Sequence, residues 1–310
     1  IVPKTFIPNY SEFYERRYFT PAPMTAVSAT AIHTAGTVNC TTAAGYSYNS
    51  QTVTIGNQTN IPFGTDILFT LTDVADFVLA CEICEDMWVP LPPSTRHALA
   101  GATVIANLSA SNEIIGKAAY RRTLVSSQSA RITGAYIYSD AGHGESTQDV
   151  VFASHNIIAE NGTILAESKL FSADKNGCTL VYADIDLERL HQERVRATTF
   201  AQCAQDAAEN SALYRKIELA LPAGAATAGT NSAAAEHALN RFVDPHPFVP
   251  SDKTARSGRC QEVITLQAEG LAKRLRHIKA KTAVIGLSGG LDSTLPLLVT
   301  CKAFDLCGLD

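Results

Sequence analysis

The sequence predicts a mixed α/β fold, in which a four-layer α-β-β-α sandwich is followed by the start of a parallel α/β domain. Three observations support this prediction. Short apolar runs alternate with helix-forming segments through most of the chain. Near the C-terminus, an apolar run enters a loop with two adjacent glycines. The chain has 310 residues, 46% of them hydrophobic, which is enough for two or three modest domains.

The N-terminal part is expected to hold a loop, an insertion and a pair of strands. A loop around Lys4 leads into a short helix over residues 12–17. Residues 21–60 are rich in Thr, Ala, Ser and Asn and almost free of charge, which indicates an extra hairpin or a mobile loop. Two apolar runs between residues 63 and 83 predict paired strands that end at Cys84.

The middle of the chain alternates between helices and strands. Pro92-Pro93-Ser94 opens a predicted helix with Ser94 as its cap, and Gly101 begins the next strand. Residues 112–133 carry helix-forming residues. Further strands are expected at residues 136–138, 150–152 and 180–182.

Beyond residue 187, the sequence predicts helix, then linker, then helix. Residues 187–214 are charged and largely helical in pattern, whereas Ala, Gly and Thr dominate residues 220–235. We interpret that small-residue stretch as a linker. Residues 260–278 show the periodicity of an amphipathic helix, with an apolar side formed by Val263, Leu266, Leu271 and Leu275.

Charge and cysteine usage argue against several classes of protein. The 25 basic and 30 acidic residues give a net charge of −5 without a basic block, so nucleic-acid binding is not expected. The sequence shows no signal peptide and no apolar run of about 18 residues, so neither secretion nor a membrane span is expected. Eight unevenly spaced cysteines are not typical of a disulfide framework. We therefore expect a cytoplasmic protein with reduced thiols.

The glycine loop near the C-terminus is typical of a backbone cradle for pyrophosphate. Adjacent glycines let the main chain approach an anion, and N–H groups of the turn and of a following helix can point at phosphates. Serine hydroxyls add donors, and Asp292 can hold Mg²⁺. The alternative is an ordinary strand–turn–helix link. The predicted nucleotide-binding residues are Gly286, Leu287, Ser288, Gly289, Gly290, Leu291, Asp292 and Ser293.

A second candidate site lies around Cys84. The apolar strand ends in Glu-Ile-Cys-Glu-Asp, and a cysteine at a sharp strand end presents its sulfur to a cleft. A cysteine forms a thiolate at neutral pH only when a cation or base is nearby. Lys4, which also follows a short apolar segment, is a candidate for that cation. Three alternatives remain open. The first two are zinc binding and redox chemistry by the C-x-x-C pair Cys81 and Cys84, although the sequence lacks the second ligand pair that a zinc site needs. The third is that the acidic residues around Cys84 form a solvated turn.

Both sites resemble known families. Lys4 with the following Pro-Asn-Tyr-x-Glu-Phe-Tyr-Glu, together with Glu-Ile-Cys-Glu-Asp, resembles the nitrilase superfamily. The resemblance extends through residues 98–111, Arg121-Arg122, residues 142–147 and a hairpin-like turn within residues 160–168. Residues 288–293 resemble the signature of the ATP pyrophosphatase family. The two modules in one chain are similar to the glutamine-dependent NAD⁺ synthetase family.

The resemblance implies two domains and a linker. Residues 1–190 would form the C-terminal part of a nitrilase-like glutaminase domain, and residues 191–258 a helical and small-residue linker. Residues 259–310 would begin a Rossmann-like synthetase domain. The family's general-base glutamate lies upstream of the lysine, and Ile1 would fall in a middle strand of the sandwich. We therefore expect an internal fragment of a longer protein.

The resemblance also assigns roles at the first site. Cys84 would be the nucleophile that attacks the glutamine side-chain amide and forms a γ-glutamyl thioester, and Lys4 would stabilise the oxyanion. Several relatives carry arginine at the position of Lys117, where lysine keeps the charge but loses the two-pronged geometry. The implied glutamine-binding residues are Tyr10, Glu85, Ser111 and Lys117.

The implied reaction is the ATP-dependent amidation of deamido-NAD⁺ to NAD⁺, with ammonia taken from glutamine. Its other products are AMP, pyrophosphate and glutamate. ATP and Mg²⁺ are the implied cofactors, and the resemblance implies a homo-oligomer, commonly an octamer. Two alternatives remain: a stand-alone nitrilase-type amidase, and a truncated, non-catalytic oligomer partner.

Overall fold

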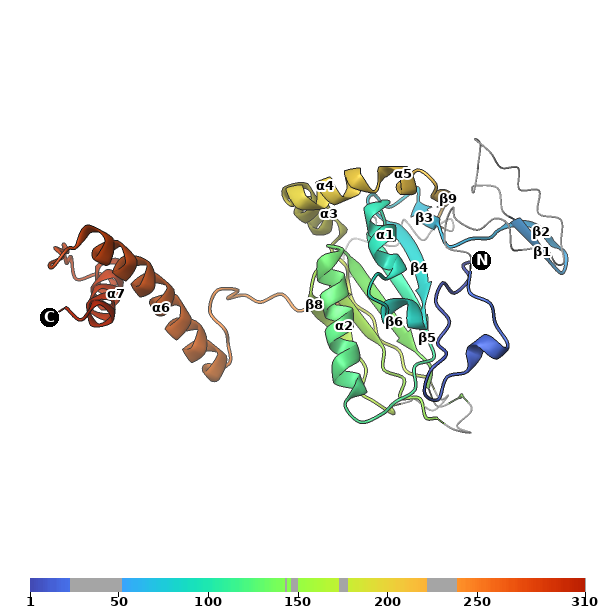
Figure 1. Ribbon diagram of the computed structural model, residues 1–310, viewed down its shortest axis with the longest axis horizontal. Helices are drawn as coiled ribbons and strands as arrows, with labels where there is room; N and C mark the ends of the chain where they lie inside the picture. The colour runs from blue at the N-terminus through green and yellow to red at the C-terminus, as the bar shows by residue number, and fades with distance from the viewer. Residues whose placement is uncertain (23–51, 143, 146–149, 173–177, 222–238, 310) are drawn as a thin grey trace, which may run out of the picture. The chain divides into compact units, whose positions relative to one another are not determined.

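The computed structural model divides the chain into two compact units, Ile1–Phe242 and Val243–Asp310 (Figure 1). The structure describes residues 1–22, 52–142, 144–145, 150–172, 178–221 and 239–309. The first unit contains every described strand, and the second is built on two helices. None of the helices in these ranges is long and apolar enough to cross a membrane.

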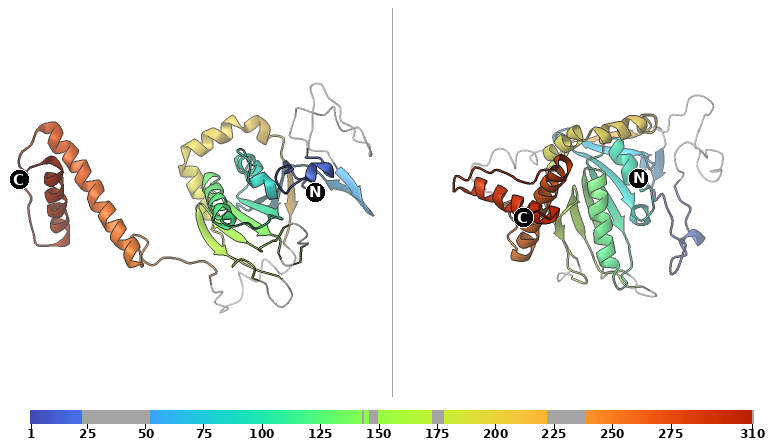
Figure 2. Two further views of the ribbon diagram at one scale, coloured as in Figure 1. Left: turned by 60° about the horizontal axis from the view of Figure 1, so that its bottom comes forward. Right: turned by 60° about the vertical axis from the view of Figure 1, so that its left-hand side comes forward.

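A seven-stranded mixed sheet forms the centre of the first unit, in the order β8-β7-β6-β5-β4-β3-β9 (Figures 1 and 2). Strands β4, β5 and β6 run parallel to one another, and β9 pairs with β3 in parallel at one edge. The remaining pairs are antiparallel. The strands are β3 (Ile67–Leu71), β4 (Val78–Ile83), β5 (Val104–Ser109), β6 (Ala135–Asp140), β7 (Ile157–Glu160), β8 (Thr163–Glu167) and β9 (Arg215–Leu219).

Helices make the parallel connections between the central strands. Helix α1 lies between β4 and β5 in the chain and α2 between β5 and β6, as parallel neighbours require a crossover connection. Both helices lie on one face of the sheet (Figure 1). The helices of this unit are η1 (Glu15–Arg17), η3 (Cys84–Met87), α1 (Pro93–Leu99), α2 (Lys117–Arg131), α3 (Leu187–Arg196), α4 (Thr198–Asp206) and α5 (Ala208–Ser211).

The main core lies between the sheet and helices α1 and α2. Ala80, Ile105 and Tyr136 are cross-strand neighbours that point into it. Side chains one position earlier in the same strands face the other way and pack near α3. The next positions on the helix-covered face of β4 and β5 are Glu82 and Asn107, both fully buried. Two polar side chains therefore continue an otherwise apolar face up to the end of β4.

The mixed α/β fold predicted from the sequence is confirmed, with a sheet rich in parallel pairs. The described residues contain this sheet and a separate hairpin, β1 (Thr52–Ile55) and β2 (Gln58–Pro62). The second large sheet of a four-layer sandwich is not among them. The hairpin falls at the end of the predicted insertion 21–60, whose residues 23–51 lie outside the described ranges.

Several local predictions agree with the structure. The paired strands before Cys84 are β3 and β4, and the helix expected over 112–133 is α2. The turn expected within residues 160–168 joins β7 to β8 through Asn161 and Gly162. Both residues have positive φ, 44° and 87°, which is the requirement of a two-residue hairpin turn and the reason for Asn-Gly at this place.

The predicted helix cap is wrong. The N-cap of α1 is Pro92, and Ser94 lies in the first helical turn. Pro93 has the fixed φ that suits a first helical position, so the helix starts before the serine. The N–H of Ser94 instead donates to the buried Glu82 carboxylate, with 2.7 Å between Ser94 N and Glu82 Oε2. Glu82, which is distant in the sequence, therefore accepts a backbone N–H bond that a local capping side chain would otherwise accept.

Two predicted strands are also absent. Residues 150–152 contribute a single bridge, between Asn112 and Phe152, and residues 180–182 have no regular structure. β-propensity alone does not make a strand, because a strand also needs a neighbour to pair with. In the range predicted as a linker, 191–258, Arg215–Leu219 form β9 instead. Residues 222–238 of that range lie outside the described ones.

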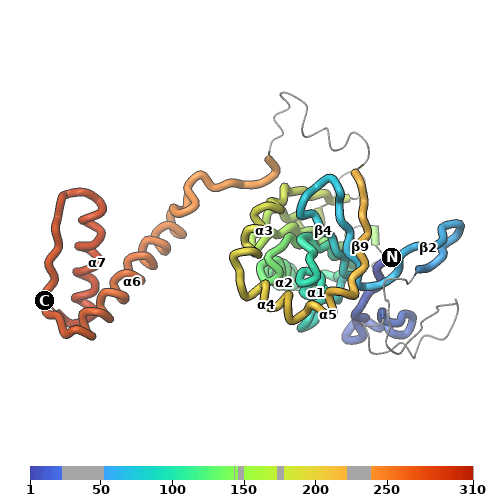
Figure 3. The backbone as a smooth tube through the Cα atoms, turned by 90° about the horizontal axis from the view of Figure 1, so that it is seen from above, coloured from blue at the N-terminus to red at the C-terminus, as the bar shows by residue number. Residues whose placement is uncertain are grey.

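The second unit consists of α6 (Lys253–Ile278) and α7 (Leu291–Cys307), which lie side by side (Figure 3). Helix α6 starts earlier than predicted because the Asp252 side chain caps it, accepting a bond from Ala255 N at 2.7 Å. Small residues of α6, Ala268 and Ala272, bring the helices together. The strand predicted before the glycine loop does not form, and the described part of this unit offers it no partner strand. The domain boundaries remain a prediction.

Candidate functional site

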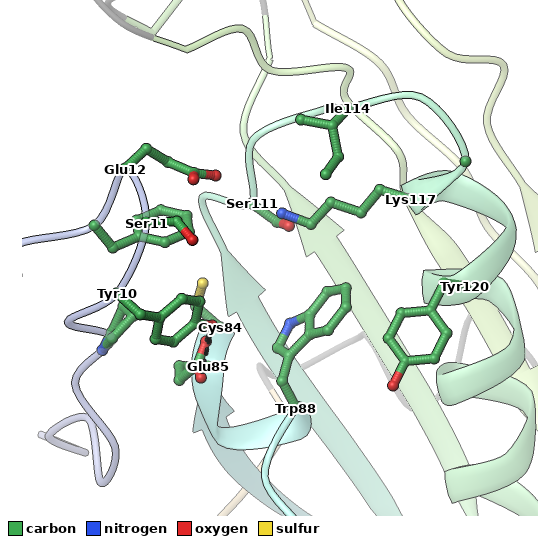
Figure 4. A pocket seen from close by; sticks show the side chains of 13 residues that line it. Tyr10, Ser11, Glu12, Cys84, Glu85, Trp88, Ser111, Ile114, Lys117 and Tyr120 are labelled. Atoms are coloured by element: carbon green, nitrogen blue, oxygen red, sulfur yellow. Dashed lines mark hydrogen bonds between the residues drawn. The ribbon is translucent and has the colours of Figure 1, made fainter.

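The end of β4 opens into a cavity of about 410 Å³ (Figure 4). Because β4 and β5 are parallel, residues that follow them meet at the same edge of the sheet. Cys84 follows β4, and Ser111 follows β5. The N-terminal segment and the start of α2 complete the wall. The cavity gathers all of the predicted Tyr10, Cys84, Glu85, Ser111 and Lys117 among its lining residues.

Cys84 occupies a strained turn at the mouth of β4. Its φ is +50°, a left-handed conformation that costs an ordinary residue about 1–2 kcal/mol. The Asn107 side chain supports this backbone from beneath. Cys84 N donates to Asn107 Oδ1 at 3.0 Å, and Asn107 Nδ2 donates to the Cys84 carbonyl at 3.4 Å. The turn directs the sulfur toward the cavity, as Figure 4 shows.

Lys117 places a cation in the same cavity. Its ammonium lies 5.3 Å from the centre of the Trp88 ring and 5.8 Å from that of Phe13. It also donates to Asn112 Oδ1 at 2.5 Å. Burial lowers the pKa of Lys117, and the nearby Arg121 charge acts in the same direction. The ammonium is therefore held in place and partly stripped of water, which favours binding of an anionic group.

Tyr10 and Glu85 form a hydrogen-bonded pair on the opposite side of Cys84. The Tyr10 hydroxyl donates to both carboxylate oxygens of Glu85, at 2.9 and 2.8 Å. Burial raises the pKa of Glu85, and it raises the pKa of the Tyr10 phenol as well. The cavity thus presents a carboxylate near Cys84 and an ammonium from Lys117 (Figure 4). That combination complements the two charged groups of an α-amino acid.

Lys4 lies beside this cavity and is not one of its lining residues. Its ammonium pairs with Glu15, 3.3 Å from Oε2. The loop that carries Lys4 is nevertheless fastened to the Cys84 turn by the buried Asp86 carboxylate. Phe6 N and Thr5 N donate to Asp86 at 2.7 and 3.3 Å. Ile83 N, one residue before the cysteine, donates to the same group at 2.9 Å.

Sequence reasoning missed several of these contacts. Trp88, the single tryptophan of the chain, was a recognisable signal because it lies four residues after Cys84. Phe13 stood in the motif after Lys4, but nothing there indicated a contact with Lys117. Asn112 had no signal of its own, and Glu15 stood in the same motif as Phe13 without a signal for its contact with Lys4, since these contacts depend on how the chain folds.

The predicted nucleotide loop lies in the second unit, between the end of α6 and α7. Gly289 has a φ of +83°, which favours glycine. The Ser293 hydroxyl lies 3.2 Å from that of Ser288 and donates to Gly290 O at 3.0 Å. Helix α7 then starts at Leu291, so its free N–H groups face the loop. This set of donors fits a phosphate group.

Asp292 is in the first turn of α7. In the described parts of the chain, no group of three or more His, Cys, Asp or Glu side chains is arranged to hold a metal ion. A single carboxylate fits Mg²⁺ only where phosphate oxygens and water supply the other ligands. The Mg²⁺ assignment therefore depends on a bound nucleotide.

Cys81 lies half-buried within β4, and burial raises the pKa of its thiol.

Known proteins resemble the chain along nearly its full length, although no family model matches it. It is 41% identical over 305 residues to the glutamine-dependent NAD(+) synthetases of Mycobacterium bovis and Mycobacterium tuberculosis. The chain is homologous to the glutamine-dependent NAD⁺ synthetases. The alignment covers 98% of this chain and 40% of those proteins. The Mycobacterium leprae protein of that name is 39% identical over 306 residues, with 98% and 39% covered. The chain thus spans about two fifths of the length of these curated relatives.

Solved structures were also found. A glutamine-dependent NAD(+) synthetase from Cytophaga hutchinsonii has a TM-score of 0.39 and 28% identity, over 55% of this chain and 22% of that one. A carbon-nitrogen hydrolase from Helicobacter pylori G27 has a TM-score of 0.43 and 18% identity, over 69% and 61%. The resemblance stated from the motifs is confirmed by the sequence relatives, whereas the roles of the individual site residues remain predictions.

Removing the Asp86 carboxylate should loosen both walls of the site. We expect Asp86→Ala to lower the free energy of unfolding by about 3 kcal/mol, because three backbone N–H groups lose a charged acceptor. Urea unfolding measures this. Asp73→Ala is the matched control at an exposed carboxylate that accepts from Leu221 N, and it should change stability by less than about 0.5 kcal/mol. An Asp86→Ala protein as stable as the control would contradict the assigned role.

Burial of Glu82 should make stability depend on pH. Burial raises the pKa of Glu82 to about 7, with Tyr136 and Asp86 as the titratable groups nearest to it. Between about pH 4.5 and 7 the folded protein then binds more protons here than the unfolded chain, so this group's contribution to stability falls as pH rises. Relative to Glu82→Gln, wild type should lose about 3 kcal/mol of unfolding free energy over that range. Parallel stability curves for the two proteins in urea titrations at several pH values would contradict this.

Proposed function

We propose that this chain carries the glutaminase site and the nucleotide loop of a glutamine-hydrolysing NAD⁺ synthetase. One observation supports the proposal above the others. A cysteine in a strained turn faces a cavity that also holds a half-buried ammonium and a carboxylate, in a chain homologous to such synthetases. The reaction is the ATP-dependent amidation of deamido-NAD⁺ with ammonia from glutamine.

The first half of the reaction takes place at Cys84. Its sulfur attacks the side-chain amide carbon of glutamine, and Lys4 stabilises the oxyanion of the tetrahedral intermediate. The carbon–nitrogen bond then breaks, ammonia leaves with an added proton, and a γ-glutamyl thioester remains. Water hydrolyses the thioester to glutamate and restores the thiol. The Asp86 bonds support this chemistry by joining the Lys4 loop to the Cys84 turn.

Glutamine is recognised by opposite charges at the two sides of the cavity. The Lys117 ammonium binds the α-carboxylate, and the Glu85 carboxylate, held by the Tyr10 hydroxyl, binds the α-ammonium group. Ser111 lines the wall between β5 and α2 and contributes a hydroxyl. Between these groups the side-chain amide of glutamine reaches the Cys84 sulfur.

The second half takes place at residues 286–293. The loop N–H groups and the Ser288 and Ser293 hydroxyls bind the phosphates of ATP, and Asp292 contributes to Mg²⁺ binding. Adenylation of the nicotinate carboxylate of deamido-NAD⁺ releases pyrophosphate, and ammonia then displaces AMP to give NAD⁺. Mg²⁺ offsets the negative charge on the phosphates when it is bound. The working protein is a homo-oligomer of such chains.

The division of labour can be tested in the full-length protein. Cys84→Ala should abolish NAD⁺ formation from deamido-NAD⁺ and ATP when glutamine is the nitrogen donor, because the thioester cannot form. With free ammonia as donor, the rate should stay within about twofold of wild type, because the second site does not use the thiol. The readout is NAD⁺ formation over time with each donor. Glutamine hydrolysis without NAD⁺ formation from either donor would point to a stand-alone amidase instead.

The role of Lys117 predicts a separation of binding from turnover. Lys117→Met should raise KM for glutamine by about 10- to 100-fold, the loss of one charged hydrogen bond, with a smaller effect on kcat. Lys117→Arg keeps the charge and should recover most of the affinity. Initial rates of glutamate release over a range of glutamine concentrations measure both constants. An unchanged KM in the Met variant would remove Lys117 from the glutamine site.

A further inference from the structure

Three buried polar side chains lie in a row beneath Cys84 and have no part in the reaction described above. Asn107 bonds to both backbone groups of Cys84, and its Nδ2 also donates to the Tyr136 hydroxyl at 3.1 Å. Tyr136 in turn donates its hydroxyl hydrogen to Glu82 Oε1. Each of the three side chains is at most 1% exposed. They come from three adjacent parallel strands, β4, β5 and β6.

The hydrogen bonds of this row allow only one orientation of the Asn107 amide. Its oxygen must face the N–H of Cys84, and its NH₂ group must face both the Cys84 carbonyl and the Tyr136 oxygen. A turned amide would place its NH₂ group against the Cys84 N–H, leaving two donors in contact. Tyr136 accepts the second N–H of the NH₂ group and therefore supports the same orientation.

Glu82 sets the direction in which the Tyr136 hydroxyl points. Glu82 Oε1 accepts the hydroxyl hydrogen of Tyr136, so the hydroxyl oxygen is left to accept from Asn107. The other carboxylate oxygen accepts from Ser94 N at 2.7 Å, which fixes the carboxyl group in place. The row therefore has a defined direction, from Asn107 through Tyr136 to Glu82.

At the Asn107 end of the row lies the Cys84 backbone, which is strained. Cys84 has a φ of +50°, a conformation that persists only where its surroundings impose it. Asn107 provides two of the contacts that do so. A small rotation of this turn would move the sulfur relative to a bound amide, and a misplacement of about 1 Å is enough to cost about 100-fold in rate.

We propose that Glu82, Tyr136 and Asn107 are positioning residues that hold the Cys84 backbone in the conformation required for attack on the amide. The inference rests on the glutaminase function proposed for Cys84. It assigns this row a role in turnover and not in substrate affinity, because none of its members lines the cavity. The opposing view is that the row only stabilises the core.

Removing the hydroxyl oxygen of one buried tyrosine distinguishes a positioning role of the row from a purely structural one. Tyr136→Phe deletes the middle of the row, whereas Tyr214→Phe deletes a different buried tyrosine hydroxyl of the same core, one bonded to His97 Nδ1 at 2.7 Å. In the full-length protein we expect Tyr136→Phe to lower kcat for glutamine hydrolysis by about 10- to 100-fold, with KM within about twofold of wild type. Tyr214→Phe should keep both constants within about twofold.

A second readout does not depend on substrate. Alkylation of Cys84 by iodoacetamide, followed by peptide mass spectrometry, should be slower in Tyr136→Phe than in wild type and unchanged in Tyr214→Phe. NAD⁺ formation with free ammonia should be unaffected in both variants, which shows that the protein is folded. If wild type hydrolyses no glutamine, the proposed function fails, and the alkylation rates still test the row.

Equal losses of kcat in the two tyrosine variants, or a rise in KM with unchanged alkylation, would overturn the proposal. Should Tyr136→Phe fail to fold, Glu82→Gln replaces it as the test. The Gln side chain keeps one acceptor but directs an NH₂ group at either Tyr136 or Ser94 N, so kcat should fall by several-fold while KM stays within about twofold. An unchanged kcat in that variant would equally overturn the proposal.

Discussion

The buried Asp86 carboxylate joins the two segments on which the candidate site depends. It accepts N–H bonds from Thr5 and Phe6 in the N-terminal loop and from Ile83 at the end of β4. These segments are about eighty residues apart in the chain, and no sheet pairing links them. Together with the bonds from the Tyr10 hydroxyl to Glu85, this carboxylate holds the N-terminal segment against the Cys84 turn. The charge is costly to bury, and its three donors offset that cost.

Buried polar groups support other walls of the cavity in a similar way. Arg121, fully buried in α2, bonds to Glu113 at 2.9 Å and His155 at 2.8 Å, and it donates to the Ser111 hydroxyl at 3.3 Å. Asp140 at the end of β6 accepts from Ser111 N at 2.9 Å. The loop after β5 is thus held by directional bonds. Apolar packing alone would leave such a loop free to shift, because hydrophobic contacts do not specify direction.

Much of the fold followed from local patterns. The apolar runs before Cys84, the helix-forming residues after Ser111 and the Asn-Gly turn at residues 161–162 each led to the observed element, because each signal acts within a few residues. The failures share one cause. Residues 180–182 pair with no strand among the described residues, and Ser94 donates to the distant Glu82 instead of capping α1.

The sequence by itself determined the identity of the chemical groups and the strand end on which Cys84 is placed. The type of side chain and the apolar run before it are local properties, and the homology to glutamine-dependent NAD⁺ synthetases was visible in the same motifs. Only the tertiary structure decided which groups meet. It brought Lys117 between Phe13 and Trp88, paired Lys4 with Glu15, and set Glu82 and Tyr136 beneath Cys84. Such contacts depend on how segments of the chain come together in the folded protein, and the register of the sheet sets those of Glu82 and Tyr136, which no local pattern in the sequence records.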